Sequence, residues 1–335
     1  MSGELDLIAA LTPLFRRPHP AVRTGIGDDC AVLEVDGATL LLTIDTFIEG
    51  IHFRREFAPP RVLGSKAAAA AISDIAAMGG EATALLVSAA LGPDWSVDDA
   101  RAIAAGIDER AAAAGAAVIG GDTATSPGPL FLDIAVLGRI PPGGRAVQRD
   151  GARPGDLVAV TGTPGESALG LRHLLGTLLL TPAEQARAVT RHLDPTPRLR
   201  EGRILASFEG VHAMIDVSDG LARDIGHLAR AAGLLAVIEP HDLPCGSAMD
   251  SLRARAPEAW RAAALGGGED YELAVALDPA AAARIMTRLE EATGTRITVV
   301  GRFGEPGTGA PGVRLEDGTR IDELGFEHPL QDSPE

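Results

Sequence analysis

Carboxylate side chains recur in short motifs beside glycine turns and apolar, strand-like runs, and they are the residues of this 335-residue chain best suited to chemistry. Six such motifs follow one another: Gly27-Asp28-Asp29, Ile44-Asp45-Thr46, Ser73-Asp74, Gly121-Asp122-Thr123, Asp216-Val217-Ser218-Asp219 and Gly268-Glu269-Asp270. Each motif alone has a structural alternative, because aspartate and glycine are the usual residues of turns and helix caps. Ser218, for example, is a residue type typical of a helix N-cap.

Asp74 is harder to explain as a turn or cap residue. On a helix its neighbours at i−4, i−3, i+3 and i+4 are Ala70, Ala71, Ala77 and Met78, so its carboxylate emerges from an apolar face of small residues. An unpaired buried carboxylate is costly, which predicts a cation beside it. Because the chain has a single lysine, that cation is either an arginine or a metal ion.

Oxygen donors without clustered histidine or cysteine favour a hard cation such as Mg²⁺ over zinc. Magnesium takes one or two carboxylates together with substrate phosphates, so acids from separate elements predict several ions that hold one polyphosphate, such as a nucleoside triphosphate. Two further features are candidate phosphate contacts. The glycine-rich turn at residues 162–167 would offer backbone N–H groups at a helix start, and Arg149 would contact phosphate unless it is an ordinary solvated arginine.

Composition narrows the class of protein. The 46 acidic residues against 30 basic ones leave a net charge of −16, which disfavours nucleic acid and anionic membranes as partners. Lys66 has no phosphate-binding loop motif around it. Cys30 and Cys245 lie far apart, so a zinc site or a disulfide framework is not expected. The chain shows no signal-peptide pattern and no apolar run of membrane-spanning length, and we expect a cytoplasmic protein.

The first half of the chain must position four of these motifs, and its pattern predicts an α+β domain. The expected elements are a leading helix from Leu5 to Phe15, a hairpin of strands Ala31–Val35 and Thr39–Asp45, helices Val62–Met78 and Val97–Ala114, and strands Ala84–Leu91, Ala116–Ile119 and Phe131–Ile140. A run rich in proline and glycine follows from Pro141. It places the domain boundary near residue 148.

The pattern then restarts as an α/β-like domain. Strands are expected at Leu157–Thr161, Val211–Ile215, Leu234–Ile238, Tyr271–Leu277 and Ile297–Val300, and helices from Glu166, at Asp219–Ala232 and at Ala280–Ala292. The predicted division is therefore a first domain over residues 1–148, a second over 149–330 and a tail over 331–335.

Taken in order, the motifs resemble those of thiamine-monophosphate kinases, a family within the aminoimidazole ribonucleotide synthetase superfamily. The resemblance runs from residue 25 to about residue 328 and is carried by residues 25–31, 45–46 with 50–53, 73–79, 119–123, 216–221 and 267–273. It implies a PurM-like architecture, with an α+β N-terminal domain and an α/β C-terminal domain. It also implies a homodimer joined through the N-terminal sheets, with the ATP sites close to the interface.

The same resemblance, carried over position by position, implies a role for each motif. Magnesium ligands are implied at Asp29, Thr43, Ile44 (through its carbonyl), Asp45, Asp74, Asp122, Asp216 and Asp219. ATP contacts are implied at Gly121, Asp122, Arg149 and Ser218. The thiamine moiety would be held by His52, Glu269 and Phe326.

Two of those substrate contacts have structural alternatives, a hydrogen-bonded histidine for His52 and a core aromatic for Phe326. Trp95, Trp260 and Tyr271 are expected to be structural. This sequence also departs from the family at two positions. Thr43 stands where serine is common, and Ala104 where some relatives place a tyrosine against the nucleotide.

The implied activity is the ATP-dependent phosphorylation of thiamine monophosphate to thiamine diphosphate, a kinase reaction of thiamine biosynthesis. Transfer would be direct and in line, assisted by several Mg²⁺ ions and with no side-chain nucleophile. The alternatives are another ATP-dependent synthetase of the same superfamily, a multi-metal phosphohydrolase that uses water as acceptor, and a nucleotide- or metal-binding regulatory protein.

Overall fold

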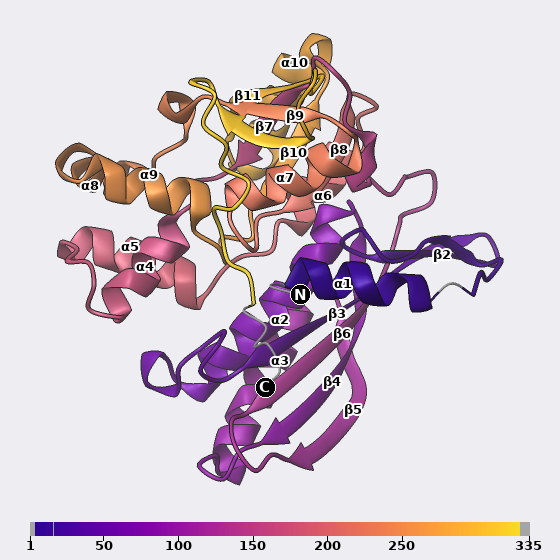
Figure 1. Ribbon diagram of the computed structural model, residues 1–335. Helices are drawn as coiled ribbons and strands as arrows, with labels where there is room; N and C mark the ends of the chain where they lie inside the picture. Colours follow the sequence, from indigo (N-terminus) through magenta and orange to yellow (C-terminus); the bar gives the residue numbers. More distant parts are fainter. Residues whose placement is uncertain (1–3, 16, 329–335) are drawn as a thin grey trace, which may run out of the picture.

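Two six-stranded sheets organise the part of the chain that the computed structural model describes, residues 4–15 and 17–328. The first sheet has the order β1 (Val22–Thr24), β2 (Ala31–Val35), β3 (Ala38–Ile48), β6 (Phe131–Arg139), β4 (Glu81–Leu91) and β5 (Ala117–Thr125). It occupies the lower half of the molecule in Figure 1, and the second sheet occupies the upper half. The predicted tail 331–335 lies outside the described residues.

Strand β3 carries site residues on only one of its faces. It pairs with β2 in the expected hairpin, whose turn contains Asp36 and Gly37 in left-handed conformations. Because a strand alternates its side chains between the two faces, buried Leu41 and Phe47 mark the inner face and exposed Ile44 marks the outer one. Thr43 and Asp45 therefore point inward and lie beneath the helices.

Helix α2 (Pro60–Ala77) is the centre of the molecule, and it confirms the helix expected over Val62–Met78. It packs against β3 and β6 of the first sheet, against α3 (Val97–Ala113), and against α6 (Leu199–Ala206) and β8 of the second half. Glycines allow these contacts, since a Cβ at Gly106 of α3 would lie 1.9 Å from the Arg61 carbonyl and one at Gly202 of α6 would lie 2.1 Å from the Ala76 carbonyl. The alanine-rich surface of α2 thus joins the two halves.

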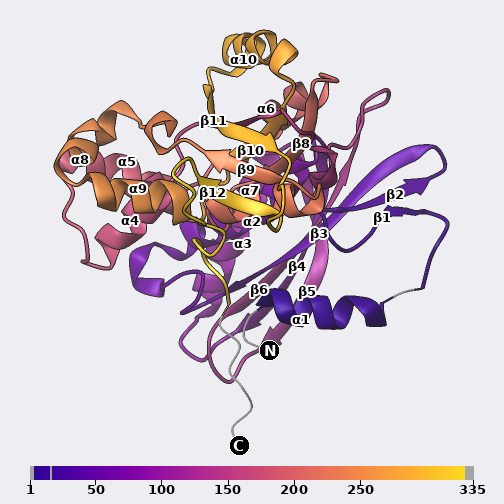
Figure 2. The ribbon, with the colours of Figure 1, turned by 45° about the horizontal axis from the view of Figure 1, so that its top comes forward.

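The second sheet has the order β12 (Gly312–Leu315), β9 (Leu235–Ile238), β11 (Ile297–Gly304), β7 (Leu157–Thr161), β10 (Leu273–Leu277) and β8 (Val211–Asp216). Its strand pairs are antiparallel except for β12 with β9. The other helices are α1 (Glu4–Leu11), α4 (Glu166–Leu174), α5 (Pro182–Leu193), α7 (Leu221–Ala231), α8 (Asp250–Arg255), α9 (Pro257–Gly266) and α10 (Pro279–Thr293). Figure 2 shows α4, α5, α8 and α9 gathered at one end of this sheet.

Most expected elements are present, but several were missed. The sequence patterns did not reveal β1, β12, α5, α6, α8 or α9. Strand β5 continues to Thr125, so Gly121 and Asp122 lie within a strand and not in a turn after it. The chain passes from the first sheet to the second between β6 and β7, and the boundary near residue 148 stays a prediction. No helix in the described ranges combines the length and apolar character needed to cross a membrane.

Candidate active site

Three carboxylates from distant parts of the chain meet at the junction of the two halves. Oxygens of Asp29, Asp74 and Asp216 all lie within 4.8 Å of one another. Asp29 lies two residues before the start of β2, Asp74 lies in the last turn of α2, and Asp216 is the final residue of β8. Asp29 and Asp216 are buried, and Asp74 is partly buried. The predicted convergence of these acids is therefore present.

Burial raises the pKa of every acid in this group, and repulsion from neighbouring carboxylates also raises the pKa of Asp45, Asp74 and Asp216. Removal from water, together with the nearby charges of Asp29 and Asp45, raises the pKa of Asp216 to about 8. Burial and Asp219 raise the pKa of Asp45 to about 6. The pKa of Asp74 is raised well above its ordinary value by burial and by the neighbouring carboxylates. The unliganded cluster thus resists full ionisation, as expected for like charges held in a low-dielectric site.

A single guanidinium faces the cluster among the described residues. Arg149 Nη2 lies 2.5 Å from Asp29 Oδ1, and the backbone N–H of Arg149 donates to Asp28 Oδ2 at 3.2 Å. The Thr43 hydroxyl donates a hydrogen bond to Asp74. Asp29 Oδ2 is buried with no hydrogen-bond partner. One cation cannot balance this many carboxylates, and the all-oxygen donor set together with the unpartnered Asp29 oxygen fits a divalent ion such as Mg²⁺.

A cavity of about 680 Å³ opens beside the cluster and is lined by both halves of the chain. Its walls hold carboxylates at Asp45, Asp74, Asp216 and Asp219, and aromatic or polar groups at Phe47, His52, Ser218, Glu269, Tyr271, Phe326 and His328. All three residues predicted to hold the thiamine moiety are among them. Their roles stay predictions, but the structure brings them to one cavity with the acids.

Rings form a continuous wall at this end of the cavity. The His52 ring stacks on Phe47 with 5.7 Å between centroids, and its Nδ1 accepts the Ile48 backbone N–H at 2.9 Å. Phe326 meets His328 edge-on with centroids 4.8 Å apart. Phe326 is 44% exposed, so the alternative of a core aromatic is wrong. Such a wall suits the face of a flat, partly cationic ring.

Two segments run side by side and present Ser218, Asp219 and Glu269 together. Glu269 N–H donates to the Ser218 carbonyl at 2.7 Å, and Tyr271 N–H donates to the Val217 carbonyl at 2.8 Å. Glu269 and Tyr271 both adopt positive φ, at +63° and +51°. Non-glycine residues rarely hold this conformation, and it is concentrated at functional sites.

The hydrogen bonds do not support two interpretations of the sequence, an N-cap role for Ser218 and a phosphate-binding turn at residues 162–167. Helix α7 is capped at Gly220, and the Asp224 carboxylate accepts the N–H groups of Asp219 and Gly220, so Ser218 is not an N-cap. Two N–H groups of the turn at residues 162–167 are already occupied by a carboxylate of the chain itself and are not available to a phosphate. Its Gly165 and Ser167 N–H groups both donate to the Asp270 carboxylate, which already fills that helix start.

The structure does not bring Asp122 and Gly121 to the acid cluster. In the first sheet Thr46 pairs with Asp133, Asp133 with Ser88, and Ser88 with Asp122. Three strand spacings, about 14 Å, therefore separate Asp122 from β3. Gly121, Asp122 and Ala104 line a separate cavity of about 350 Å³ against α3.

Thr43 and Ile44 flank Asp45 on β3. The Thr43 hydroxyl reaches the cluster through Asp74. The Ile44 side chain points to the outer face, where it is 65% exposed. The role of its backbone carbonyl as a metal ligand stays a prediction.

Sequence reasoning missed two residues of this cavity. The sequence shows no phosphate-binding loop around Lys66 and predicts no other role for it. In the structure Lys66 is buried beside Glu269, with 2.7 Å between Nζ and Oε1. The available signal was a lone lysine inside an alanine-rich helix. Tyr271 was assigned a structural role, but it lines the cavity two residues after Glu269.

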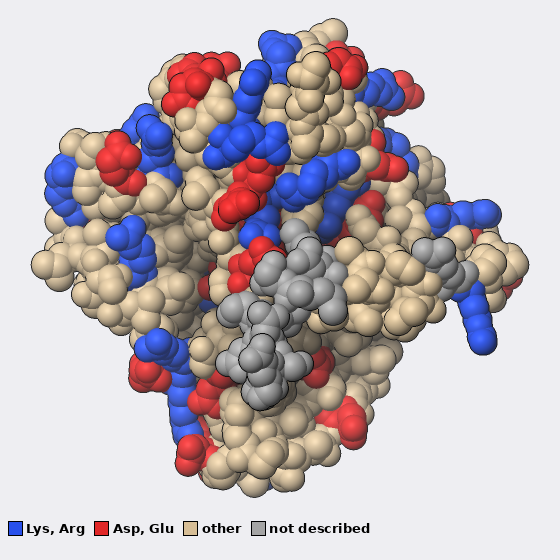
Figure 3. Space-filling view, in the orientation of Figure 1, with Lys and Arg blue, Asp and Glu red and all other residues tan. Residues whose placement is uncertain are grey.

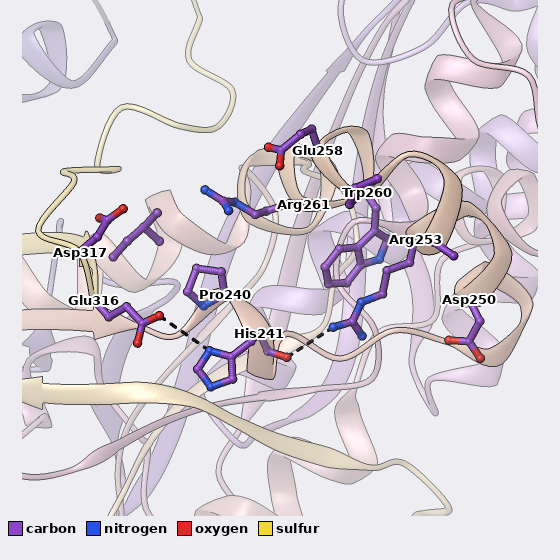
Figure 4. A pocket seen from close by; sticks show the side chains of 12 residues that line it. Pro240, His241, Asp250, Arg253, Glu258, Trp260, Arg261, Glu316 and Asp317 are labelled. Atoms are coloured by element: carbon purple, nitrogen blue, oxygen red, sulfur yellow. Dashed lines mark hydrogen bonds and ion pairs between the residues drawn. The ribbon is translucent and has the colours of Figure 1, made fainter.

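A second cavity, of about 620 Å³, lies in the second half and contains none of the predicted site residues. Figure 4 shows its charged lining, where the Arg253 guanidinium lies 4.5 Å from the Trp260 ring centre and His241 lies 3.9 Å from Glu316. Both acidic and basic side chains line this cavity, and the buried Trp260 forms part of its wall. It lacks the convergent carboxylates of the junction cavity.

Comparison with known families defines the class of protein. The chain matches the AIR synthase related protein, N-terminal domain, over residues 27–140, and the corresponding C-terminal domain over residues 153–313. It is thus a two-domain, PurM-like protein, as the fold-class prediction states.

Individual relatives define the family more narrowly. The chain is 39% identical to the thiamine-monophosphate kinase of Salmonella typhimurium (strain LT2) over 278 residues, 81% of each chain. It is 36% identical to that of Escherichia coli O157:H7 over 330 residues, 97% of this chain and 98% of the relative. A solved structure, AaThiL complexed with AMPPCP and TMP, superposes with a TM-score of 0.82 at 31% identity and covers 97% of both chains. The chain belongs to the thiamine-monophosphate kinase family.

The electrostatics of the cluster predict an unusual stability effect. Asp74→Asn removes a buried carboxyl group that, without a metal ion, must either ionise beside like charges or be held protonated, and it keeps an acceptor for the Thr43 hydroxyl. It should therefore stabilise the protein in EDTA by about 1–3 kcal/mol, the order of a like-charge contact near 5 Å. In Mg²⁺ the ranking should reverse, because the wild type alone gains a full ligand set. Thermal unfolding with and without Mg²⁺ measures both, and Asp108→Asn on the exposed face of α3 is the control. A variant less stable than wild type in EDTA would contradict the repulsion argument.

Proposed function

We propose that this protein transfers the γ-phosphoryl group of ATP to thiamine monophosphate and forms thiamine diphosphate. The observation that carries the proposal is the junction cavity, where convergent carboxylates lie at one end and an aromatic wall with Glu269 lies at the other. The names of the relatives support the acceptor. The structural relative bound to AMPPCP and TMP supports both substrates.

The acceptor is itself a phosphate monoester, so the attacking oxygen requires no general base. The second pKa of such a phosphate is about 6, and near neutral pH its oxygens are already ionised. No side chain of the described cavity is arranged as a nucleophile with a base beside it. We infer direct transfer without a phosphorylated protein intermediate, and detection of labelled protein after rapid mixing with labelled ATP would refute it.

The main obstacle is repulsion between an anionic donor, an anionic acceptor and an acidic protein. Asp29, Asp74 and Asp216 would hold Mg²⁺, with Asp45, Asp219, Thr43 and the Ile44 carbonyl as further ligands to more than one ion. Bound Mg²⁺ neutralises phosphate oxygens and favours in-line geometry. The protein's own contribution is to hold the acceptor ring with His52, Glu269 and Phe326 and to exclude water between its two halves.

The nucleotide contacts divide between two places. Ser218 lies in the junction cavity, and Arg149 lies beside Asp29 and is available to phosphate once a metal ion takes over that carboxylate. Gly121 and Asp122 lie with Ala104 in the smaller cavity against α3. The small side chain of Ala104 leaves room there.

We also propose a homodimer through the outer face of the first sheet. Leu42, Ile44 and Leu86 are 45–65% exposed on that face, and both Ile44 and Leu86 lie next to Ala135 in register. Exposed apolar patches of this kind mark protein interfaces. Sedimentation should give about twice the 34.5 kDa chain mass. Leu86→Asp should shift it to the monomer, and a monomeric wild type would overturn this proposal.

The activity itself can be tested by phosphorus NMR of purified protein with ATP, Mg²⁺ and thiamine monophosphate. A diphosphate ester should appear, and Asp45→Asn should lower kcat by about 100-fold or more, because metal ligands supply several kcal/mol of transition-state stabilisation. Asp108→Asn should leave the rate unchanged. Release of inorganic phosphate at the same rate with or without the acceptor would instead indicate a phosphohydrolase.

A further inference from the structure

A buried ion pair stands behind the substrate end of the cavity. Lys66 on α2 is 1% exposed, and its Nζ lies 2.7 Å from Glu269 Oε1 and 5.8 Å from the centre of the Phe47 ring. Glu269 is the only carboxylate among the described residues that lies within ion-pair distance of Lys66. The Glu269 side chain keeps 23% exposure and lines the cavity. The Glu269 carboxylate therefore contacts Lys66 on its buried side, and its other side faces the cavity.

His192 on α5 completes the network. Its Nε2 lies 3.4 Å from Lys66 Nζ, and its Nδ1 lies 3.1 Å from Ser167 Oγ and 3.5 Å from Glu269 Oε2. An ammonium group only donates hydrogen bonds, so Nε2 is the acceptor and Nδ1 carries the ring proton. Burial and the nearby Lys66 charge lower the pKa of His192 to about 4, so the ring is neutral near pH 7.

Neither Lys66 nor His192 can reach a ligand directly, because both side chains are almost fully buried and neither lines the cavity. Replacement of a buried ion pair by apolar residues is often neutral or stabilising. A contribution to the stability of the fold is therefore a weak explanation for this ion pair. Its geometry instead orients Glu269, whose backbone at φ +63° is itself constrained.

We infer that Lys66 and His192 are positioning residues that orient the Glu269 carboxylate toward the cationic, N–H-bearing part of the acceptor. This inference rests on the proposed function, in which the acceptor carries a positively charged thiazolium ring and an aminopyrimidine. The Lys66 charge comes from α2 in the first half and Glu269 from the second. Acceptor recognition therefore requires both halves to be packed together.

The test is a double-mutant cycle read by equilibrium binding of thiamine monophosphate without ATP, together with steady-state kinetics. Lys66→Met should weaken acceptor binding and raise its KM at least tenfold, while the KM for ATP stays within about twofold. Glu269→Gln should cause a similar loss. The double variant should bind no worse than Glu269→Gln alone, because Lys66 acts through that carboxylate.

A second pair of variants covers the case in which Lys66→Met fails to fold. His192→Asn keeps an N–H donor near the position of Nδ1, whereas His192→Leu removes it, so Asn should retain more acceptor affinity than Leu. Arg255→Met is the matched control. This substitution removes the ion-pair partner of the buried Glu184 carboxylate, and neither residue lines the cavity. It should lower the free energy of unfolding without changing the affinity for the acceptor.

The outcomes separate the two proposals. If the wild type neither binds nor phosphorylates thiamine monophosphate, the proposed function fails, and the positioning role fails with it. If the wild type is active but folded Lys66→Met binds the acceptor normally, only the positioning role is overturned. It is also overturned if the losses from Lys66→Met and Glu269→Gln multiply in the double variant, or if His192→Asn and His192→Leu behave alike.

Discussion

The structure depends on a repulsion that the protein does not neutralise with its own side chains. Asp29, Asp74 and Asp216 are held within 4.8 Å of one another at a buried junction, with Asp45 close by, and Arg149 is the one guanidinium on the cluster in the described part of the chain. Such an arrangement is costly until a cation of higher charge enters. In this chain of net charge −16, the proposed function assigns to metal ions the task of bringing anionic substrates close to these carboxylates.

The fold provides this arrangement through α2. Its small side chains and the facing glycines of α3 and α6 allow backbones to pack closely, and Asp74 is thereby fixed beneath the inner face of β3. The same helix carries Lys66 about two turns earlier, beside Glu269. One helix thus contributes Asp74 to the carboxylate cluster and Lys66 to the ion pair with Glu269 at the other end of the same cavity.

The sequence predicted the elements and residues whose signals are local. The hairpin of β2 and β3, helix α2 and the six acidic motifs were all found from periodicity and turn residues, and the family resemblance followed from their order. What it could not give were relations between distant residues. The Lys66 to Glu269 contact, the placement of Asp122 three strands away from β3, and the hydrogen bonds from the turn at residues 162–167 to Asp270 all depend on tertiary packing. Helices α5 and α6 were missed because they are short and mostly polar in composition, so no apolar run marked them.

The most direct test of this account is the affinity of a non-hydrolysable ATP analogue, measured by isothermal titration calorimetry with Mg²⁺ and again in EDTA. If the carboxylates bind the nucleotide through metal ions, binding should be strong in Mg²⁺ and lost in EDTA, and Asp216→Asn should weaken the Mg²⁺-dependent binding at least tenfold. Equal affinity in Mg²⁺ and in EDTA would show that the protein holds the phosphates without metal ions, and would contradict the central claim.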